Sequence, residues 1–170
     1  MKAVFLALAL VAAGDATPVT MARTPGEVQV GQVLRQAPMQ GILGPSRLLS
    51  DFRGKPMIIN VWASWCGPCQ AEMPSLQRLA DRAGPQAHVI GISTDDYHDR
   101  AESFVRTFKI GFPNFIDSKL RLEHMLGADR LPLTLLVDAQ GKVLAKHYGA
   151  KEWDSPEAMA YVTKHLRIKL

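Results

Sequence analysis

Cys66 and Cys69 are the only cysteines in this chain of 170 residues, and two residues separate them. They lie in the stretch "WASWCGPCQAEMP", which begins at Trp62. Thiols at this spacing can cycle between a dithiol and a disulfide, supply half of a metal site, or form a permanent structural link. The remainder of the sequence has to decide between these three uses.

Two of these uses fit the sequence poorly. A structural zinc site needs four ligands, and the chain has neither a second Cys pair nor histidines at ligand spacing. A disulfide that closes so short a loop constrains the unfolded chain very little, because the entropic stabilisation grows with loop length. We therefore interpret the pair as redox-active, and we expect no bound metal.

The elements around the pair give each thiol a separate task. Residues 56–63 form a continuous apolar run, which is typical of a strand buried on both faces, and a helix should follow from the cysteines. Cys66 then lies at the helix N-terminus, where unpaired N–H groups and the helix dipole lower the pKa of its thiol. Cys69, one turn along on the buried side, is placed to attack a mixed disulfide formed at Cys66. Gly67 keeps the approach to Cys66 open, and Pro68 suits a first-turn position that needs no N–H.

Patterns of apolar residues and of turn residues place the other elements along the chain. Before the cysteines we expect a hairpin at residues 39–55. After the first helix, which should end near Ala83, we expect a strand at residues 87–93, a helix capped by Asp95 or Asp96 and a short strand near Phe115. We then expect a helix at residues 119–126, a hairpin at residues 131–149 and a last helix with Ser155 as its N-cap. This order predicts an α/β fold with a central mixed β-sheet flanked by helices and an N-terminal β-hairpin extension.

The composition fits one folded domain and argues against a nucleic-acid partner. Hydrophobic residues make up 47% of the chain and charged residues 21%, so the chain can bury a core. The net charge is +4, with Lys and Arg dispersed among acidic residues and no basic run. We interpret the charge as a solvated surface and expect no nucleic-acid binding.

The first residues have the pattern of a secretory signal peptide. Lys2 precedes an apolar run at residues 3–13, which is too short to span a bilayer, and small residues follow. We expect a signal peptide over residues 1–22 and a folded domain over residues 23–170; the alternative is an ordinary buried helix or strand. No cysteine follows the run, which excludes a lipid anchor of the bacterial lipoprotein kind. Export would place the Cys pair in an oxidising compartment.

The stretch "NVWASWCGPCQAEMPSL" resembles the active site of the thioredoxin superfamily, and more narrowly that of the exported TlpA/ResA-like thiol–disulfide oxidoreductases. The resemblance covers residues 31–165 and includes "LGADRLPLTLLVDAQGKV". It implies a thioredoxin fold in which Pro132 follows a cis peptide bond beside the Cys pair. It also implies that an extended substrate pairs with the backbone of Leu131, while Trp65 covers Cys66. The expected substrate-binding residues are thus Trp65, Gly67, Pro68, Leu131 and Pro132.

Glu72, three residues after Cys69, matches an acidic residue of ResA-type proteins, and we count it with the two cysteines as a candidate catalytic residue. Two roles are open. The carboxylate either shuttles the proton of the buried thiol or is a solvated first-turn residue that favours the helix dipole. Cytosolic thioredoxins carry a buried Asp behind the pair, where this chain has Asn60. Because Asn cannot accept a proton at ordinary pH, the role of base falls to Glu72, to water or to nothing.

The resemblance implies a thiol–disulfide oxidoreductase of the bacterial cell envelope. Cys66 and Cys69 would reduce disulfides of exported proteins, such as apocytochrome c or copper-site assembly proteins. The electrons would come from a membrane-embedded thiol donor, and no organic cofactor is needed. We expect the protein to be a monomer.

Four rival functions make different demands on the sequence. A copper-delivery module of the same fold needs a Cys-x-x-x-Cys spacing and a distant His, and the spacing here is one residue shorter. A peroxidase of the superfamily has a different motif around its reactive Cys, and a disulfide isomerase needs a dimerisation module. A non-catalytic binding domain, in contrast to all of these, would keep its function after Cys66→Ser.

Overall fold

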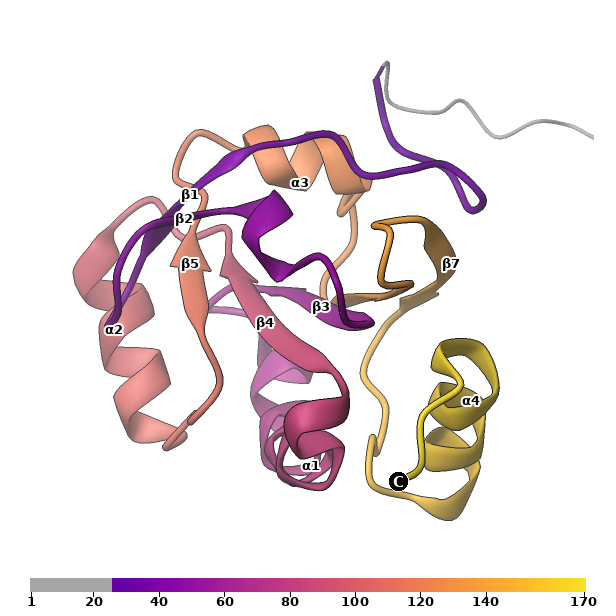
Figure 1. Cartoon of the computed structure of the whole chain (residues 1–170). Coiled ribbons are helices and arrows are strands. Elements are labelled where there is room, and N and C mark those ends of the chain that lie inside the picture. Colours follow the sequence, from indigo (N-terminus) through magenta and orange to yellow (C-terminus); the bar gives the residue numbers. More distant parts are fainter. Residues whose placement is uncertain (1–25) are drawn as a thin grey trace, which may run out of the picture.

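The computed structural model describes residues 26–170, which Figure 1 shows as a central sheet with helices on both faces. The expected signal peptide over residues 1–22 lies outside the described residues. Among residues 26–170, no helix combines the length and the apolar character needed to cross a membrane.

Seven strands form one sheet in the order β2-β1-β5-β4-β3-β6-β7. Their bounds are β1 Pro38–Gly41, β2 Arg47–Leu48, β3 Met57–Trp62, β4 His88–Ser93, β5 Asn114–Ile116, β6 Leu133–Val137 and β7 Val143–Tyr148. β3 pairs in parallel with β4 and antiparallel with β6, so the sheet is mixed, as predicted. The expected N-terminal hairpin is β1–β2, and β1 extends the sheet by pairing antiparallel with β5.

Helices cover the two faces of the sheet unequally (Figure 1). They are α1 Gly67–Ala83, α2 His98–Thr107, α3 Arg121–Leu126 and α4 Pro156–Leu166, with a 3₁₀ helix η1 at Leu49–Phe52. α1, α2 and α4 share one apolar cluster with Ile58 and Trp62 of β3. α3 and η1 share the other cluster with Ile59 and Val61. Because side chains alternate along a strand, β3 contributes to both clusters and is buried along its whole length.

The structure confirms the predicted N-cap of α4 and contradicts the predicted N-cap of α2. Ser155 caps α4 as predicted, since its Oγ accepts a hydrogen bond from the N–H of Ala158 at 3.2 Å. The predicted cap of α2 is wrong, because Tyr97 is the N-cap residue and makes no side-chain cap. The carboxylate of Asp95 turns instead toward Ser64 and Ser93, where three donors are available to it.

A partly buried ion pair holds the loop between α3 and β6 in place. Lys146 Nζ lies 2.6 Å from Glu27 Oε1 and also donates to the carbonyl oxygen of Leu126 at 2.7 Å. Gly127 has φ +76°, and a Cβ there would collide with the side chain of Glu27. The segment before β1 is therefore locked against the loop that leads into β6, and this loop forms one wall of the site described below.

Gly91 of β4 allows a polar pair to be buried between strands. Trp62 Nε1 donates to Asn114 Oδ1 at 3.1 Å, and Asn114 Nδ2 donates to the carbonyl oxygen of Phe112 at 2.8 Å. A Cβ at position 91 would collide with Asn114 Oδ1 and would lie 2.7 Å from Trp62 Nε1. Only glycine leaves room for this hydrogen bond.

We expect Gly91→Ala to lower the free energy of unfolding by about 2–4 kcal/mol, through overpacking and the loss of a buried hydrogen bond. Urea denaturation measures the change. Gly44→Ala is the matched control, because a Cβ at position 44 meets nothing within 4 Å. The control should stay within about 0.5 kcal/mol of the unmodified protein. Equal stabilities of the two variants would contradict the close packing at Gly91.

Candidate active site

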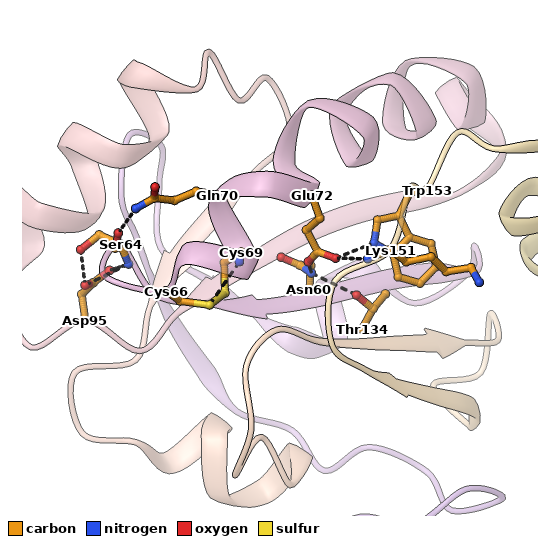
Figure 2. Close-up of a disulfide and its surroundings, with 10 residues drawn as sticks. All are labelled: Asn60, Ser64, Cys66, Cys69, Gln70, Glu72, Asp95, Thr134, Lys151 and Trp153. Carbon is orange, nitrogen blue, oxygen red and sulfur yellow. Dashed lines mark hydrogen bonds between the residues drawn. A yellow bond between two sulfur atoms is a disulfide. The ribbon is translucent and has the colours of Figure 1, made fainter.

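Cys66 and Cys69 form a disulfide with an S–S distance of 2.09 Å and a Cα–Cα distance of 5.2 Å (Figure 2). The two sulfurs differ in their surroundings. Cys69 is 0% exposed, whereas Cys66 is 6% exposed and borders an open groove. An incoming thiol or disulfide therefore meets Cys66, and Cys69 can react only from inside the protein.

Cys66 is the N-cap residue of α1, as the sequence predicts. Its Sγ accepts a hydrogen bond from the N–H of Cys69 at 3.2 Å, and Pro68 occupies the first turn without needing a donor. In the reduced protein the same N–H and the positive end of the helix dipole favour a thiolate at Cys66. The local backbone thus favours a thiolate at Cys66 over one at Cys69.

The turn between β3 and α1 is fixed by Asp95, as Figure 2 shows. Its carboxylate accepts from Ser64 Oγ at 2.6 Å and from Ser64 N at 3.0 Å, and it also accepts from Ser93 Oγ at 2.6 Å. Gln70 Nε2 of α1 donates to the carbonyl oxygen of Ser64 at 2.9 Å. These bonds tie the turn to both β4 and α1, so they set the position of Cys66.

Glu72 is buried, being only 2% exposed, which rules out the solvated first-turn role. Its carboxylate accepts hydrogen bonds from Asn60 Nδ2 at 2.7 Å, from Trp153 Nε1 at 2.9 Å and from Lys151 N at 3.2 Å. In Figure 2 the Glu72 side chain lies one turn along α1 from Cys69, and its carboxylate lies between Asn60 and Trp153. The arrangement thus places a buried, titratable carboxyl group one helical turn from Cys69.

Burial raises the pKa of Glu72 to about 7, and the donors from Trp153, Asn60 and Lys151 limit the rise. The side-chain amide of Asn60 can form a hydrogen bond with Glu72 in either protonation state of that carboxyl group. Its Nδ2 donates to the carboxylate and to Thr134 Oγ1, while its Oδ1 has no hydrogen-bond partner among the described residues. A turned amide would offer Oδ1 to a protonated Glu72, and the Thr134 hydroxyl can reverse its role from acceptor to donor.

A groove of about 460 Å³ lies beside the disulfide, and we name it the Cys66 groove. Four of the five expected substrate-binding residues line it together with Cys66, namely Trp65, Gly67, Pro68 and Leu131. The fifth, Pro132, is buried and lies outside this lining, although its peptide bond with Leu131 is cis as the resemblance implies. Trp65 borders the groove as a 72% exposed side chain, so it flanks Cys66 rather than sealing it from solvent.

Sequence reasoning missed the rest of the groove lining, which consists of Thr94, Glu123, Ala128 and Asp129. Thr94 follows β4, Glu123 lies in α3, and Ala128 and Asp129 precede β6. No local sequence pattern connects these residues with the cysteines. It also missed two hydrogen bonds behind the pair, the one from Trp153 to Glu72 and the one from Asn60 to Thr134. Within residues 26–170, no group of three or more His, Cys, Asp or Glu side chains is arranged to hold a metal ion.

The match to a family model covers residues 30–149 and is to the AhpC/TSA family. The chain belongs to this family. Thiol-disulfide oxidoreductase ResA of Geobacillus thermodenitrificans is 30% identical over 144 residues, covering 84% of this chain and 83% of the relative. Thioredoxin-like protein YneN of Bacillus subtilis is 27% identical over 125 residues, covering 72% and 73% of the two chains.

Two solved structures confirm the thioredoxin-like fold. One, from Chlorobium tepidum and described as a thiol:disulfide interchange protein DsbE, has a TM-score of 0.76 at 24% identity, covering 82% of this chain and 99% of that chain. StoA from Bacillus subtilis has a TM-score of 0.62 at 24% identity, covering 70% of this chain and 91% of the StoA chain. The family, the fold and the Cys66–Cys69 pair together make this chain a thioredoxin-like thiol–disulfide oxidoreductase.

The buried carboxyl of Glu72 predicts a pH-dependent stability of the oxidised protein. Its pKa is about 7 in the folded state and 4.5 when unperturbed, so between these values the folded state holds a proton that the unfolded state has lost. The free energy of unfolding should therefore fall as the pH rises from 4.5 to 7. This contribution amounts to about 3 kcal/mol, since one pKa unit corresponds to about 1.4 kcal/mol.

Urea denaturation across this pH range, compared between the unmodified protein and Glu72→Gln, measures this contribution. The variant should lack the fall, whereas Glu157→Gln should retain it, because the side chain of Glu157 is 88% exposed. Parallel pH profiles for the unmodified protein and Glu72→Gln would contradict this prediction, because they would mean that folding does not raise the pKa of Glu72.

Proposed function

We propose that this oxidoreductase works in the bacterial cell envelope and reduces disulfides of exported proteins through a Cys66–Cys69 cycle. The observation that carries this proposal is the division of the pair, with Cys66 at a helix N-terminus on an open groove and Cys69 fully buried behind it. A purely structural link would not need one sulfur presented to solvent at a site that favours a thiolate.

In the first step, the Cys66 thiolate attacks one sulfur of the substrate disulfide. A mixed disulfide forms between Cys66 and that sulfur, the substrate S–S bond breaks, and the other substrate sulfur leaves as a thiolate that takes a proton from water. The N–H of Cys69 and the dipole of α1 hold the attacking thiolate in place before the attack.

In the second step, the Cys69 thiol loses its proton and attacks Cys66 Sγ. The mixed disulfide breaks, the second substrate sulfur leaves as a thiolate, and the Cys66–Cys69 disulfide is restored. Two electrons have passed from the pair to the substrate. Glu72 acts as the base for Cys69, because its carboxyl is buried one turn away and its pKa of about 7 allows both protonation states near neutral pH.

The walls of the Cys66 groove bind the substrate chain on either side of its disulfide. Trp65 supplies an exposed aromatic face, and Gly67 and Pro68 leave the approach to Cys66 free. Leu131 offers its backbone to an extended chain from the opposite wall. Pro132 lies behind this wall and shapes it from the buried side.

The place and direction of the reaction rest on the N-terminal sequence and on the relatives. Lys2 and the apolar run at residues 3–13 support export by a signal peptide over residues 1–22, ahead of a domain over residues 23–170. In an oxidising compartment the pair needs a dedicated source of electrons, which we assign to a membrane-embedded thiol donor. Oxidised apocytochrome c and copper-site assembly proteins are the candidate substrates, and the protein acts as a monomer without a bound cofactor.

Two single substitutions at the cysteines test the cycle. Cys66→Ser should reduce insulin reduction, followed with dithiothreitol as the electron source, to the rate of dithiothreitol alone, because the nucleophile is lost. Cys69→Ser should also stop turnover, and when the pre-reduced variant is mixed with insulin after removal of dithiothreitol, it should accumulate a mixed disulfide between Cys66 and insulin, visible by non-reducing mass spectrometry. If Cys66→Ser retained the activity of the unmodified protein, the chain would be a binding module and the proposed cycle would be wrong.

A further inference from the structure

We infer that the Cys66 groove selects substrate segments that carry a lysine or arginine beside the reacting cysteine. Glu123 and Asp129, which line the groove, are the residues that make this selection. The inference rests on the proposed disulfide reduction and names the class of substrate for it.

The charge of the groove is opposite to that of the whole chain. The chain has a net charge of +4, yet among residues 26–170 the charged side chains that line the Cys66 groove are Glu123 and Asp129 alone. Arg130 is next in sequence, but its guanidinium carbon lies 5.2 Å from the centre of the Tyr148 ring and is no part of the groove lining. The reacting sulfur thus lies in a locally negative surface on a positive protein.

Neither groove carboxylate has a hydrogen-bond or ion-pair partner among the described residues. Most other acidic side chains do: Glu27 pairs with Lys146, and Asp95 accepts from two serines. Asp117 is held by the backbone N–H groups of Arg121 and Glu123. The carboxylates of Glu27, Asp95 and Asp117 are therefore satisfied within the protein, whereas the two that line the Cys66 groove are free to pair with a ligand.

Partial burial increases the effect of a charge partner at Glu123. Desolvation raises the pKa of this half-buried carboxyl, and the charge of His124 opposes the rise. A carboxylate that has lost part of its water without gaining a partner attracts a cation more strongly than a fully solvated one. A lysine or arginine of the substrate supplies that partner.

The apolar part of the groove suits the same occupant. Leu131, Ala128 and Pro68 contribute apolar lining against which the stem of a long side chain can pack, and Trp65 in the same lining is 72% exposed. An indole face attracts ammonium and guanidinium groups, but it has no such attraction for a carboxylate. Both charge and aromatic surface thus favour a basic residue and disfavour an acidic one at the same place.

Two peptides of otherwise identical sequence test this selection. Each is closed by a disulfide between its two cysteines, and they differ only in carrying Lys or Glu beside one cysteine. Pre-reduced protein is mixed with each peptide at pH 8 and low salt, and acid-quenched samples are analysed for free peptide thiols. Each rate is divided by the rate with uncharged dithiothreitol, which removes intrinsic differences between the two disulfides.

We expect the unmodified protein to reduce the Lys peptide about tenfold faster than the Glu peptide at low salt, with a smaller ratio in 0.5 M NaCl. The double variant Glu123→Gln/Asp129→Asn should bring the low-salt ratio to about twofold or less, because both charges are gone. Asp81→Asn is the matched control and should keep the ratio, since Asp81 lies about 20 Å along α1 from Gly67.

Equal rates for the two peptides with the unmodified protein would overturn the selection while leaving disulfide reduction intact. An unchanged preference in the double variant would also overturn it, because the charges of Glu123 and Asp129 would then have no part in the preference. If the unmodified protein reduced neither peptide, nor insulin, the proposed function would fail, and this inference with it.

Discussion

The capping of α1 by Cys66 is the constraint on which the rest of the site depends. One backbone N–H, that of Cys69, points at Cys66 Sγ from 3.2 Å, and the helix dipole acts in the same direction. The fully buried β3 brings the chain to this point, and Asp95 holds the turn through Ser64 and Ser93. Because α1 then continues inward, Cys69 is buried by the same geometry that presents Cys66 to the groove. The unequal roles of the two sulfurs thus follow from where a helix begins.

Glu72 introduces a second constraint, because a carboxyl group is removed from water inside an apolar cluster. Three donors compensate its charge only in part, and the pKa remains near 7. The group is therefore poised to gain or lose a proton at the pH where thiol exchange takes place, which a fully compensated carboxylate could not do. Asn60, at the position where cytosolic thioredoxins have an acid, donates a hydrogen bond to Glu72 and so favours the ionised form of its carboxyl group.

The sequence allows the fold and the reactive pair to be predicted because both depend on local patterns. The apolar run of β3, the helix start at Cys66 and the cap at Ser155 are each encoded within a few residues. The burial of Glu72 is not, because its partner Trp153 is 81 residues away in the chain. Asp95 has the residue type and position of a helix cap, yet the distant Ser64 and the neighbouring Ser93 donate to its carboxylate instead. Glu123 and Asp129 look like ordinary surface acids until the fold brings α3 and the following loop to the sulfur.

The reduction potential of the Cys66–Cys69 pair is the most direct test of a reducing role. The purified protein is equilibrated with a series of thiol redox buffers, and the free thiols are counted after alkylation. We expect a value near or below about −250 mV, in the range of proteins kept reduced by a dedicated donor. A value above about −180 mV would instead make the protein an oxidant of thiols and would contradict the direction of electron flow proposed here.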